Sequence, residues 1–509
     1  MKEKNIHRAK LNISTTLLGQ IVATACGIVV PRIMIGTFGS ATYGITTSIA
    51  QFLAYISLLE SGIGRVARAE LYKPLAERNA HEISRVYYAV KRFFRTVGVA
   101  FVVYTLVLSL TYYDLAKVTE LSRKTVFLLV WVISTTTLAQ YLGGLANLTL
   151  LNADQRQYLG NTVVSVTTAL NALLVFLLTS FDSSILIVKL GSSIVYIAQP
   201  LCYAIFVKKL FKLRPVGKDR SALKQKWTGI GQHLAYFIHT NTDVVLLTLF
   251  ADVRLVAVYA VYSMVVSSIR KIALSCTGGM EAAFGEMYAK GEKKELRSAF
   301  RQYKFLLAFV TVILFGATAV LIVPFVRLYT KGVTDADYIQ PIFAVILLYA
   351  EMLDCFMFPC ASLPVSANRL KETRMGSYAE AVINIVLSLL LIRWNPLVGV
   401  AIGTLAATLF KGLYYMVYSA KNILEMKLRE PIKYLLFTTL SVGIFAAAGA
   451  FLAKAELIRN FYGWALWGVI AFAVIALFAT AVSRLLFPDE FRKMLSLLKR
   501  KARRKTGAV

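Results

Sequence analysis

The sequence is poor in the residues on which most enzyme active sites and disulfide-bonded proteins depend. Its 509 residues include only four histidines and five cysteines. No two cysteines have C-x-x-C spacing, and no cysteines and histidines are spaced like zinc ligands. His233 and His239 are six residues apart and so do not share a helix face, as paired metal ligands would. We also find no phosphate-binding glycine loop, no paired acidic metal motif and no nucleophile elbow. We therefore predict no catalytic residues, no metal site, no cofactor and no enzymatic activity.

Acidic residues are also scarce. The chain holds 27 Asp and Glu against 57 Lys and Arg, which gives a net charge of +30, yet charged residues make up only 17% of it and hydrophobic residues 57%. This composition lies outside the range of soluble globular proteins. The basic residues lie mostly in short loops between long apolar stretches, a distribution typical of membrane proteins, and it excludes nucleic acid as the partner that the net charge alone would suggest.

The apolar stretches predict an all-α polytopic membrane protein. A bilayer core of about 30 Å requires about 20 mostly apolar residues per helix, and about fourteen stretches meet this length. They are residues 12–38, 42–64, 92–112, 125–150, 158–180, 183–207, 229–250, 255–278, 303–328, 338–363, 376–392, 397–419, 432–453 and 461–486. The first apolar run is too long for a cleaved signal peptide, so we expect an uncleaved first span.

The basic residues also predict the orientation of the chain. If the N-terminus is cytoplasmic, most of the 57 Lys and Arg residues fall in cytoplasmic segments and few in external loops. Cytoplasmic loops of membrane proteins carry this excess. We therefore predict a multi-pass protein of the cytoplasmic (inner) membrane with both termini in the cytoplasm. The external loops are short and leave no room for an extracytoplasmic catalytic lobe.

The basic segment 208–228 separates six spans from eight. Residues 35–49 weakly resemble residues 247–261, and each of these pieces forms the turn between the first and second span of its half. Repeated halves are common in secondary transporters, with the substrate path between them. We predict an N-lobe at 1–207, a cytoplasmic linker at 208–228, a C-lobe at 229–419, a final helix pair at 420–486 and a basic cytoplasmic tail at 487–509.

Ionisable residues inside the spans are the candidate functional residues, because each costs at least about 2.5 kcal/mol at the bilayer centre and so tends to face a cavity or a partner. A diphosphate lipid headgroup crossing the membrane needs compensating positive charge. The candidates for a substrate-binding cavity are Arg32, Glu60, Arg65, Arg68, Arg270 and Lys271. Two alternatives stay open: Arg32 extends to the outer interface, and Glu60, Arg65 and Arg68 form only an inner-interface cluster.

The acidic residues inside the spans are the candidates for ion coupling. Asp243 lies in the polar patch TNTD at 240–243, and Glu351 and Asp354 are three residues apart, on one helix face. The alternatives are a helix-to-helix hydrogen bond for Asp243 and a structural network with Arg or Lys of another span for the pair. We rank Lys189, Glu380 and Lys411 below these residues.

Several segments in both halves resemble those of a known family. They are VPR at 30–32, FGS at 38–40 followed by YG at 43–44, QFLAYISLLESGIG at 51–64, LYKPLA at 71–76, TNTD at 240–243, GMEAAFG at 279–285, YTKG at 329–332 and GVAIGTL at 399–405. On these segments the chain resembles the polysaccharide flippases of Wzx type, in the multidrug/oligosaccharidyl-lipid/polysaccharide (MOP) exporter superfamily. The resemblance covers essentially the whole chain.

The resemblance implies two pseudo-symmetric six-helix lobes plus a C-terminal helix pair, alternating access of a central cationic cavity and an undecaprenyl-diphosphate-linked oligosaccharide as cargo. The related lipid II flippases keep arginines in their first spans, and Arg32 and Arg65 match these loosely by position. We therefore expect a transporter that flips lipid-linked repeat units for cell-surface polysaccharide biosynthesis, with membrane lipids as partners and H⁺ or Na⁺ as coupling ion. The alternatives are a cation or drug antiporter of the same superfamily and a membrane enzyme of polysaccharide assembly.

Overall fold

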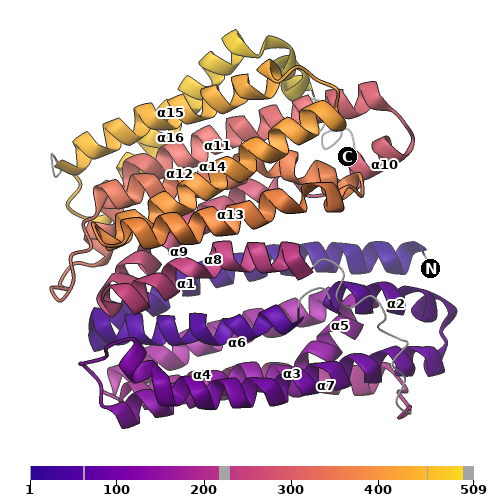
Figure 1. Ribbon diagram of the computed structural model, residues 1–509, viewed down its shortest axis with the longest axis vertical. Helices are drawn as coiled ribbons and strands as arrows, with labels where there is room; N and C mark the ends of the chain where they lie inside the picture. The colour runs from indigo at the N-terminus through magenta and orange to yellow at the C-terminus, as the bar shows by residue number, and fades with distance from the viewer. Residues whose placement is uncertain (1, 61–62, 217–229, 455–456, 497–509) are drawn as a thin grey trace, which may run out of the picture. The chain divides into compact units, whose positions relative to one another are not determined.

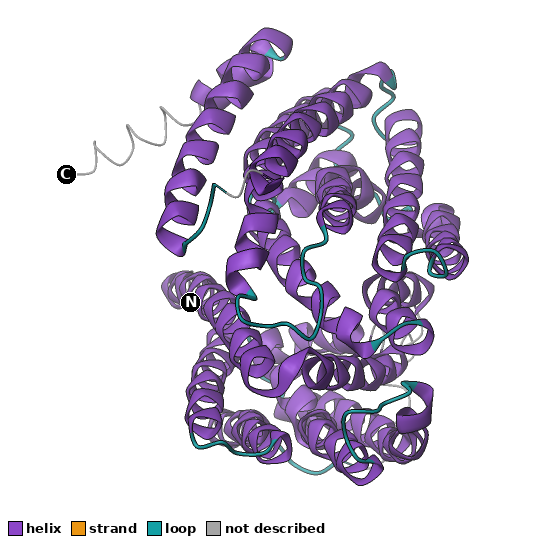
Figure 2. Ribbon diagram, turned by 90° about the vertical axis from the view of Figure 1, so that its left-hand side faces the viewer, coloured by secondary structure: helices purple, strands orange, loops and turns teal. Residues whose placement is uncertain are grey.

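The structure, a computed structural model, describes residues 2–60, 63–216, 230–454 and 457–496, without the side chains of residues 2–6, 65, 230–236, 238–240 and 370. Residues 217–228 of the predicted linker and 497–509 of the predicted tail therefore lie outside the described residues. Figure 2 shows that the described chain consists of helices joined by turns and loops, with no strand in those ranges. The predicted all-α fold class is confirmed.

The described helices form two compact units. Unit 1 comprises residues 1–257 and 333–336, and unit 2 comprises residues 258–332 and 337–509. The helices of unit 1 are α1 (Lys2–Ala54), α2 (Ile63–Glu77), α3 (Ala80–Leu115), α4 (Arg123–Ala139), α5 (Leu145–Ala153), α6 (Gln157–Ser180), α7 (Ile185–Leu210), α8 (Ile230–Phe250) and the start of α9 (Val253–Ser275). Unit 2 holds the rest of α9, with α10 (Met280–Ala289), α11 (Lys293–Tyr329), α12 (Pro341–Ser366), α13 (Leu370–Leu391), α14 (Pro396–Asn422), α15 (Arg429–Lys454) and α16 (Phe461–Leu486). The predicted lobe boundaries at 207, 229 and 419 stay a prediction.

In the described part of the chain, twelve helices are long and apolar enough to cross a membrane. Helix α1 is about 80 Å long at 1.5 Å per residue, which is enough for two crossings. It breaks at Gly39, between the first two predicted spans, and α8 with 21 residues has the length of one more crossing. The total agrees with the predicted number of about fourteen, and the chain is a multi-pass membrane protein.

The break in α1 has a specific cause in the backbone. Gly39 has φ 79° and ψ 167°, a conformation that favours glycine because it has no side chain. The backbone N–H and the hydroxyl of the next residue, Ser40, both donate to the carboxylate of Asp335, at 2.7 Å each. Asp335 belongs to the short segment 333–336 of unit 1 and caps the N-terminus of the second half of α1, where a negative charge is favourable.

Unit 2 is built around α11 and α12. Helix α11 packs against α10, α12, α15 and α16, and α12 packs against α14, which in turn lies along α13 (Figure 1). Most residues of α12 are buried. A charged residue on this helix is therefore held among neighbouring helices, and its charge must be balanced there.

Candidate functional site

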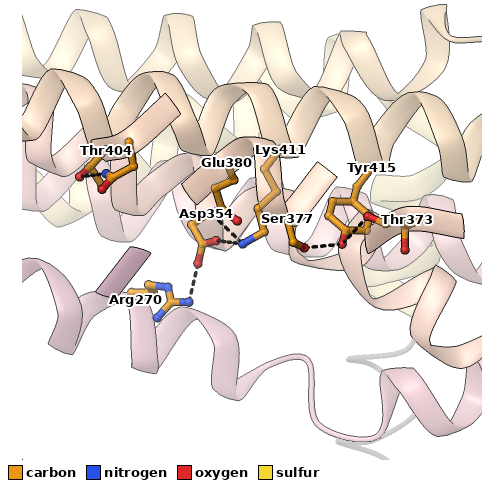
Figure 3. A network of polar contacts seen from close by, with 9 residues as sticks. Arg270, Asp354, Thr373, Ser377, Glu380, Thr404, Lys411 and Tyr415 are labelled. Carbon is orange, nitrogen blue, oxygen red and sulfur yellow. Dashed lines mark hydrogen bonds and ion pairs between the residues drawn. The ribbon is translucent and has the colours of Figure 1, made fainter. Parts of the chain in front are cut away.

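The two acidic residues of α12 lie on one face of the helix and share a partner on α9. The Nε atom of Arg270 lies 3.4 Å from Oε2 of Glu351. A terminal nitrogen of the same guanidinium donates a hydrogen bond to Oδ2 of Asp354 (Figure 3). Lys271, the next residue along α9, is exposed. The structure therefore brings together three of the candidate residues named from the sequence, Arg270, Glu351 and Asp354.

A second cation joins this cluster from α14. Lys411 Nζ lies 3.0 Å from Oε1 of Glu380, on α13, and 3.9 Å from Oδ1 of Asp354. Asp354 thus lies between two cations, with one oxygen toward Arg270 and the other toward Lys411 (Figure 3). We call Arg270, Glu351, Asp354, Glu380 and Lys411 the ionic network.

The ionic network contains more acid than base. Three carboxylates face two cations, so the network has a formal charge of −1 when every group is ionised. Taking charges out of water costs several kcal/mol per ion unless partners compensate. Because the charges of these five groups sum to −1, the network is suited to take up a proton or another cation.

Polar side chains continue from the ionic network along α13 and α14. Ser377 lies 3.0 Å from the Tyr415 hydroxyl on one side of the Glu380–Lys411 pair. On the other side, Asn384 donates to Thr404 Oγ1 at 2.8 Å. All four of these side chains are buried, and Figure 3 shows Thr404, Ser377 and Tyr415 on either side of Glu380 and Lys411. The interface between α13 and α14 is therefore polar along much of its length.

The close approach of α13 and α14 depends on glycines. A Cβ atom at Gly403 would lie 2.1 Å from Oγ of Ser388 and 2.9 Å from its backbone nitrogen. A Cβ atom at Gly399 would lie 2.6 Å from the backbone carbon of Leu391. The Gly-xxx-Gly spacing at these two positions serves helix packing, as small residues do in membrane helices.

The candidates of unit 1 have different surroundings. Glu60 ends the 3₁₀ turn Tyr55–Glu60 and accepts a hydrogen bond from the hydroxyl of Tyr141. Tyr141 lies in a π-helical turn, Gln140–Gly144, a distortion frequent at functional sites. Arg32 and Arg68 are both half-buried, and the side chain of Arg65 lies outside the described residues.

Asp243 is buried in α8, with a relative exposure of 2%. Its neighbour Thr242 is also buried. The ring of Tyr55 packs edge to face on Phe237, one turn and a half earlier in α8. Asp243 therefore lies in a partly aromatic contact between α8 and the 3₁₀ turn of unit 1.

Sequence reasoning missed one buried cation. Lys304 is fully buried in α11, where its Nζ donates to the Phe356 carbonyl at 2.9 Å and lies 3.5 Å from the centre of the Phe356 ring. The Sγ atom of Cys360 is 3.6 Å away. Lys304 lies at the start of the predicted span 303–328 and is not among the candidate residues named from the sequence. Its position next to the apolar run from 305 is the one signal that could have marked it as buried. Within the described ranges, no three His, Cys, Asp or Glu side chains gather closely enough to hold a metal ion.

The fold is similar to several solved transporter structures. The lipid II flippase MurJ in an inward closed conformation matches with a TM-score of 0.69 and 14% sequence identity, over 93% of this chain and 98% of that one. A MOP superfamily transporter from Pyrococcus furiosus matches with a TM-score of 0.56 and 14% identity, over 83% and 97%. The MATE multidrug transporter DinF-BH matches with a TM-score of 0.52 and 17% identity, over 82% and 97%.

No protein-family model and no curated protein sequence matches the chain. The structural matches are long, since they cover more than four-fifths of this chain and nearly all of each neighbour. At such identities they establish the fold. The resemblance seen in the sequence is thereby confirmed at the level of architecture: the chain has the fold of the MOP exporter superfamily.

Proposed function

We propose that this chain flips polyprenyl-diphosphate-linked oligosaccharide repeat units across the cytoplasmic membrane, for cell-surface polysaccharide biosynthesis. The observation that carries the proposal is Arg270, a guanidinium that keeps 24% exposure inside a membrane-spanning helix. A diphosphate cannot enter hydrocarbon without compensating charge, and a guanidinium binds its oxygens in a fixed two-pronged geometry. The similarity in fold to a protein named as a lipid II flippase supports a lipid-linked cargo.

The proposed mechanism is alternating access between an N-lobe (1–207) and a C-lobe (229–419). The five cations among the candidate cavity residues of the sequence analysis, Arg270 included, form its cationic surface. With the termini in the cytoplasm, most Lys and Arg residues fall in cytoplasmic segments and few in external loops, and this asymmetry supports the orientation. Membrane lipids and an undecaprenyl-diphosphate oligosaccharide are the expected partners. The protein relocates its cargo and changes no covalent bond in it.

Cells lacking this chain and any related transporter test the proposal. Lipid-linked repeat units should accumulate on the cytoplasmic face, which a membrane-impermeant reagent that labels the saccharide measures as a loss of outward-facing units. Wild-type protein should restore labelling, and Arg270→Ala should not. The matched control is Arg301→Ala, which removes an arginine from an exposed ion pair with Glu430 and should restore labelling. Normal labelling in the strain without the chain would refute the proposal.

We further propose that an ion gradient drives transport, with H⁺ or Na⁺ carried by Asp243, Glu351 or Asp354. The formal charge of −1 in the ionic network supports this role for Glu351 and Asp354. Purified protein in liposomes should flip a labelled lipid-linked saccharide faster when a gradient of the coupling ion is imposed. Transport that continues unchanged without any ion gradient or membrane potential would remove the coupling ion from the mechanism.

A second candidate function is the export of cationic drugs, and the excess of acid in the ionic network is the observation in its favour. Overexpression would then raise drug resistance and dye efflux, and loss of the chain would leave the labelling of lipid-linked units unchanged. An enzymatic role requires a chemical product. Purified protein incubated with a lipid-linked saccharide should return it with its bonds intact, and a longer or ligated product would indicate a polymerase or ligase instead.

A further inference from the structure

The exposure of the ionic network differs from residue to residue. Side-chain exposure is 24% for Arg270, 26% for Glu351, 19% for Asp354 and 18% for Lys411, but only 1% for Glu380. Charged groups inside a membrane protein face the protein interior or a water-filled cavity, because hydrocarbon cannot solvate them. The four partly exposed groups are therefore within reach of water and of a polar ligand, whereas Glu380 is buried beside Lys411.

The contacts in the network run in series. Arg270 on α9 is bonded to Asp354 on α12, Asp354 lies next to Lys411 on α14, and Lys411 is bonded to Glu380 on α13. Any change in the charge of Glu380 alters how strongly Lys411 is drawn toward Asp354. That in turn alters how strongly Asp354 holds Arg270. The buried end of the series is thus linked to the guanidinium at its exposed end (Figure 3).

We propose that binding of an anionic diphosphate at Arg270 is linked to the uptake of one proton by the carboxylates of this network. The inference rests on the proposed function, since it takes the lipid diphosphate as the ligand. To reach the guanidinium, the phosphate oxygens must replace Glu351 and Asp354 as its partners. The displaced carboxylates then lie beside a second anion, and like charges at such distances repel strongly. A proton from water that binds one carboxylate oxygen removes this repulsion and brings the network from −1 to neutral.

Other polar and titratable groups lie close to the network. On α12, Cys355 is buried next to Asp354 and lies 4.0 Å from Thr311 of α11, and Lys304 of α11 binds the Phe356 carbonyl. On α14, Tyr415 lies one turn from Lys411 and is bonded to Ser377 of α13. The described polar contacts of α12 with α10 and α15 involve neutral groups, Ser366 with the Glu281 carbonyl and Tyr349 with the Thr439 carbonyl. Lys271 is the other cation near Arg270 along α9, and it is exposed. The proton therefore belongs to the three carboxylates as a coupled set.

The test uses the full chain in detergent micelles and a short-chain prenyl diphosphate sugar as the probe. This probe is a diphosphate diester, so its own charge stays constant between about pH 5 and 8. Calorimetric titration gives the affinity at each pH. Repeating it in buffers with different heats of ionisation gives the number of protons taken up on binding. Wild-type affinity should rise as the pH falls, by up to about tenfold per pH unit, with up to one proton taken up.

Two variants test the series of contacts. Asp354→Asn removes the carboxylate between the two cations and should give tighter binding at neutral pH with little dependence on pH. Glu380→Gln leaves both partners of Arg270 in place and frees Lys411 to turn to Asp354, so it should also flatten the pH profile. The control is Glu430→Gln, the same kind of change at the exposed partner of Arg301, and it should keep the wild-type profile. A purely structural role for the two residues would lower affinity equally at every pH.

The outcomes separate this inference from the proposed function. Binding that does not change with pH, or a pH profile that both variants preserve, would overturn the linkage and leave the diphosphate cargo intact. If the wild-type protein does not bind the probe at any pH while it still expels cationic dyes, the proposed cargo is wrong, and the inference fails with it.

Discussion

Unit 1 contains Glu60 and unit 2 contains Glu380, and these two glutamates are stabilised in different ways. In unit 1, Glu60 accepts a hydrogen bond from the neutral hydroxyl of Tyr141. In unit 2, Glu380 accepts one from the ammonium of Lys411 at 3.0 Å, and the same ammonium lies 3.9 Å from Asp354. A phenol supplies a hydrogen bond but no charge. An ammonium also balances charge, and Lys411 does so for both Glu380 and Asp354.

The difference predicts how each unit responds to substitution. Removing one partner of a buried ion pair costs about 3–5 kcal/mol, because an uncompensated charge stays behind. Removing a neutral hydrogen-bond donor costs about 1–3 kcal/mol. Unit 2 should therefore be the more sensitive to loss of a single polar group, and the following variants, in order of falling effect, examine that expectation.

The largest effect is expected for Lys411→Met, which leaves three carboxylates against the single guanidinium of Arg270. The free energy of unfolding should fall by about 3–5 kcal/mol, measured by thermal or denaturant unfolding in detergent micelles. The double variant Lys411→Met/Glu380→Gln removes one charge of each sign and restores the formal charge of −1. It should recover a large part of the loss. A double variant no more stable than the single one would show that charge balance is not what Lys411 provides.

The next effect is steric and compares the α13–α14 contact of unit 2 with an open position in unit 1. Gly403→Ala places a methyl group 2.1 Å from Ser388 Oγ and 3.0 Å from the Asn384 carbonyl, so the helices must separate slightly. The expected loss is about 1–3 kcal/mol. Gly27→Ala in α1 is the matched control, because nothing lies within 4 Å of its Cβ. It should be neutral or stabilising by up to about 1 kcal/mol. Equal losses at both positions would contradict close packing of α13 on α14.

Most of the fold can be predicted from the sequence. Each span must be a helix, because it has to satisfy its backbone hydrogen bonds internally, and it needs about 20 mostly apolar residues to cross the hydrocarbon. The break at Gly39 lies where the apolar runs 12–38 and 42–64 meet. The helix ends were less accurate: α3 begins at Ala80 and α11 at Lys293, each about ten residues before the predicted span. A measure of hydrophobicity finds only the part of a helix that lies in hydrocarbon.

The candidate site could be predicted only in part. The spacing of Glu351 and Asp354 places both on one face of a helix, and this was readable from the sequence. Their link to Lys411 and Glu380 depends on how α12, α13 and α14 pack, which spacing along the chain does not encode. The environment of Lys304 likewise arises from α12, about fifty residues further along the chain.

A smaller effect is expected in unit 1 for Tyr141→Phe. The variant removes the hydroxyl that donates to Glu60 and keeps the ring, which packs on Phe94 and Phe101. The unfolding free energy should fall by about 1–2 kcal/mol, less than for Lys411→Met. Tyr203→Phe is a useful reference, since it makes the same change at another buried tyrosine of unit 1. If Tyr141→Phe costs as much as Lys411→Met, the hydroxyl does more than satisfy one hydrogen bond, and the contrast between the units fails.

The smallest effect is expected outside the membrane, at Glu425 between α14 and α15. Lys293 donates to its carboxylate at 2.5 Å and Arg297 at 3.1 Å, and these contacts lower the pKa of Glu425 below its ordinary value. A carboxylate with a lowered pKa in the folded state stabilises the protein while it is ionised, and this contribution is lost as the pH falls through that pKa. Glu425→Gln should therefore unfold at a slightly lower temperature than wild type at neutral pH, and the two curves should meet below about pH 4. Because water screens an exposed ion pair, the loss of stability relative to wild type should be the smallest among the four variants. A loss of stability as large as that of Tyr141→Phe would mean that a location inside the membrane is not what makes the polar contacts of the two units stabilising.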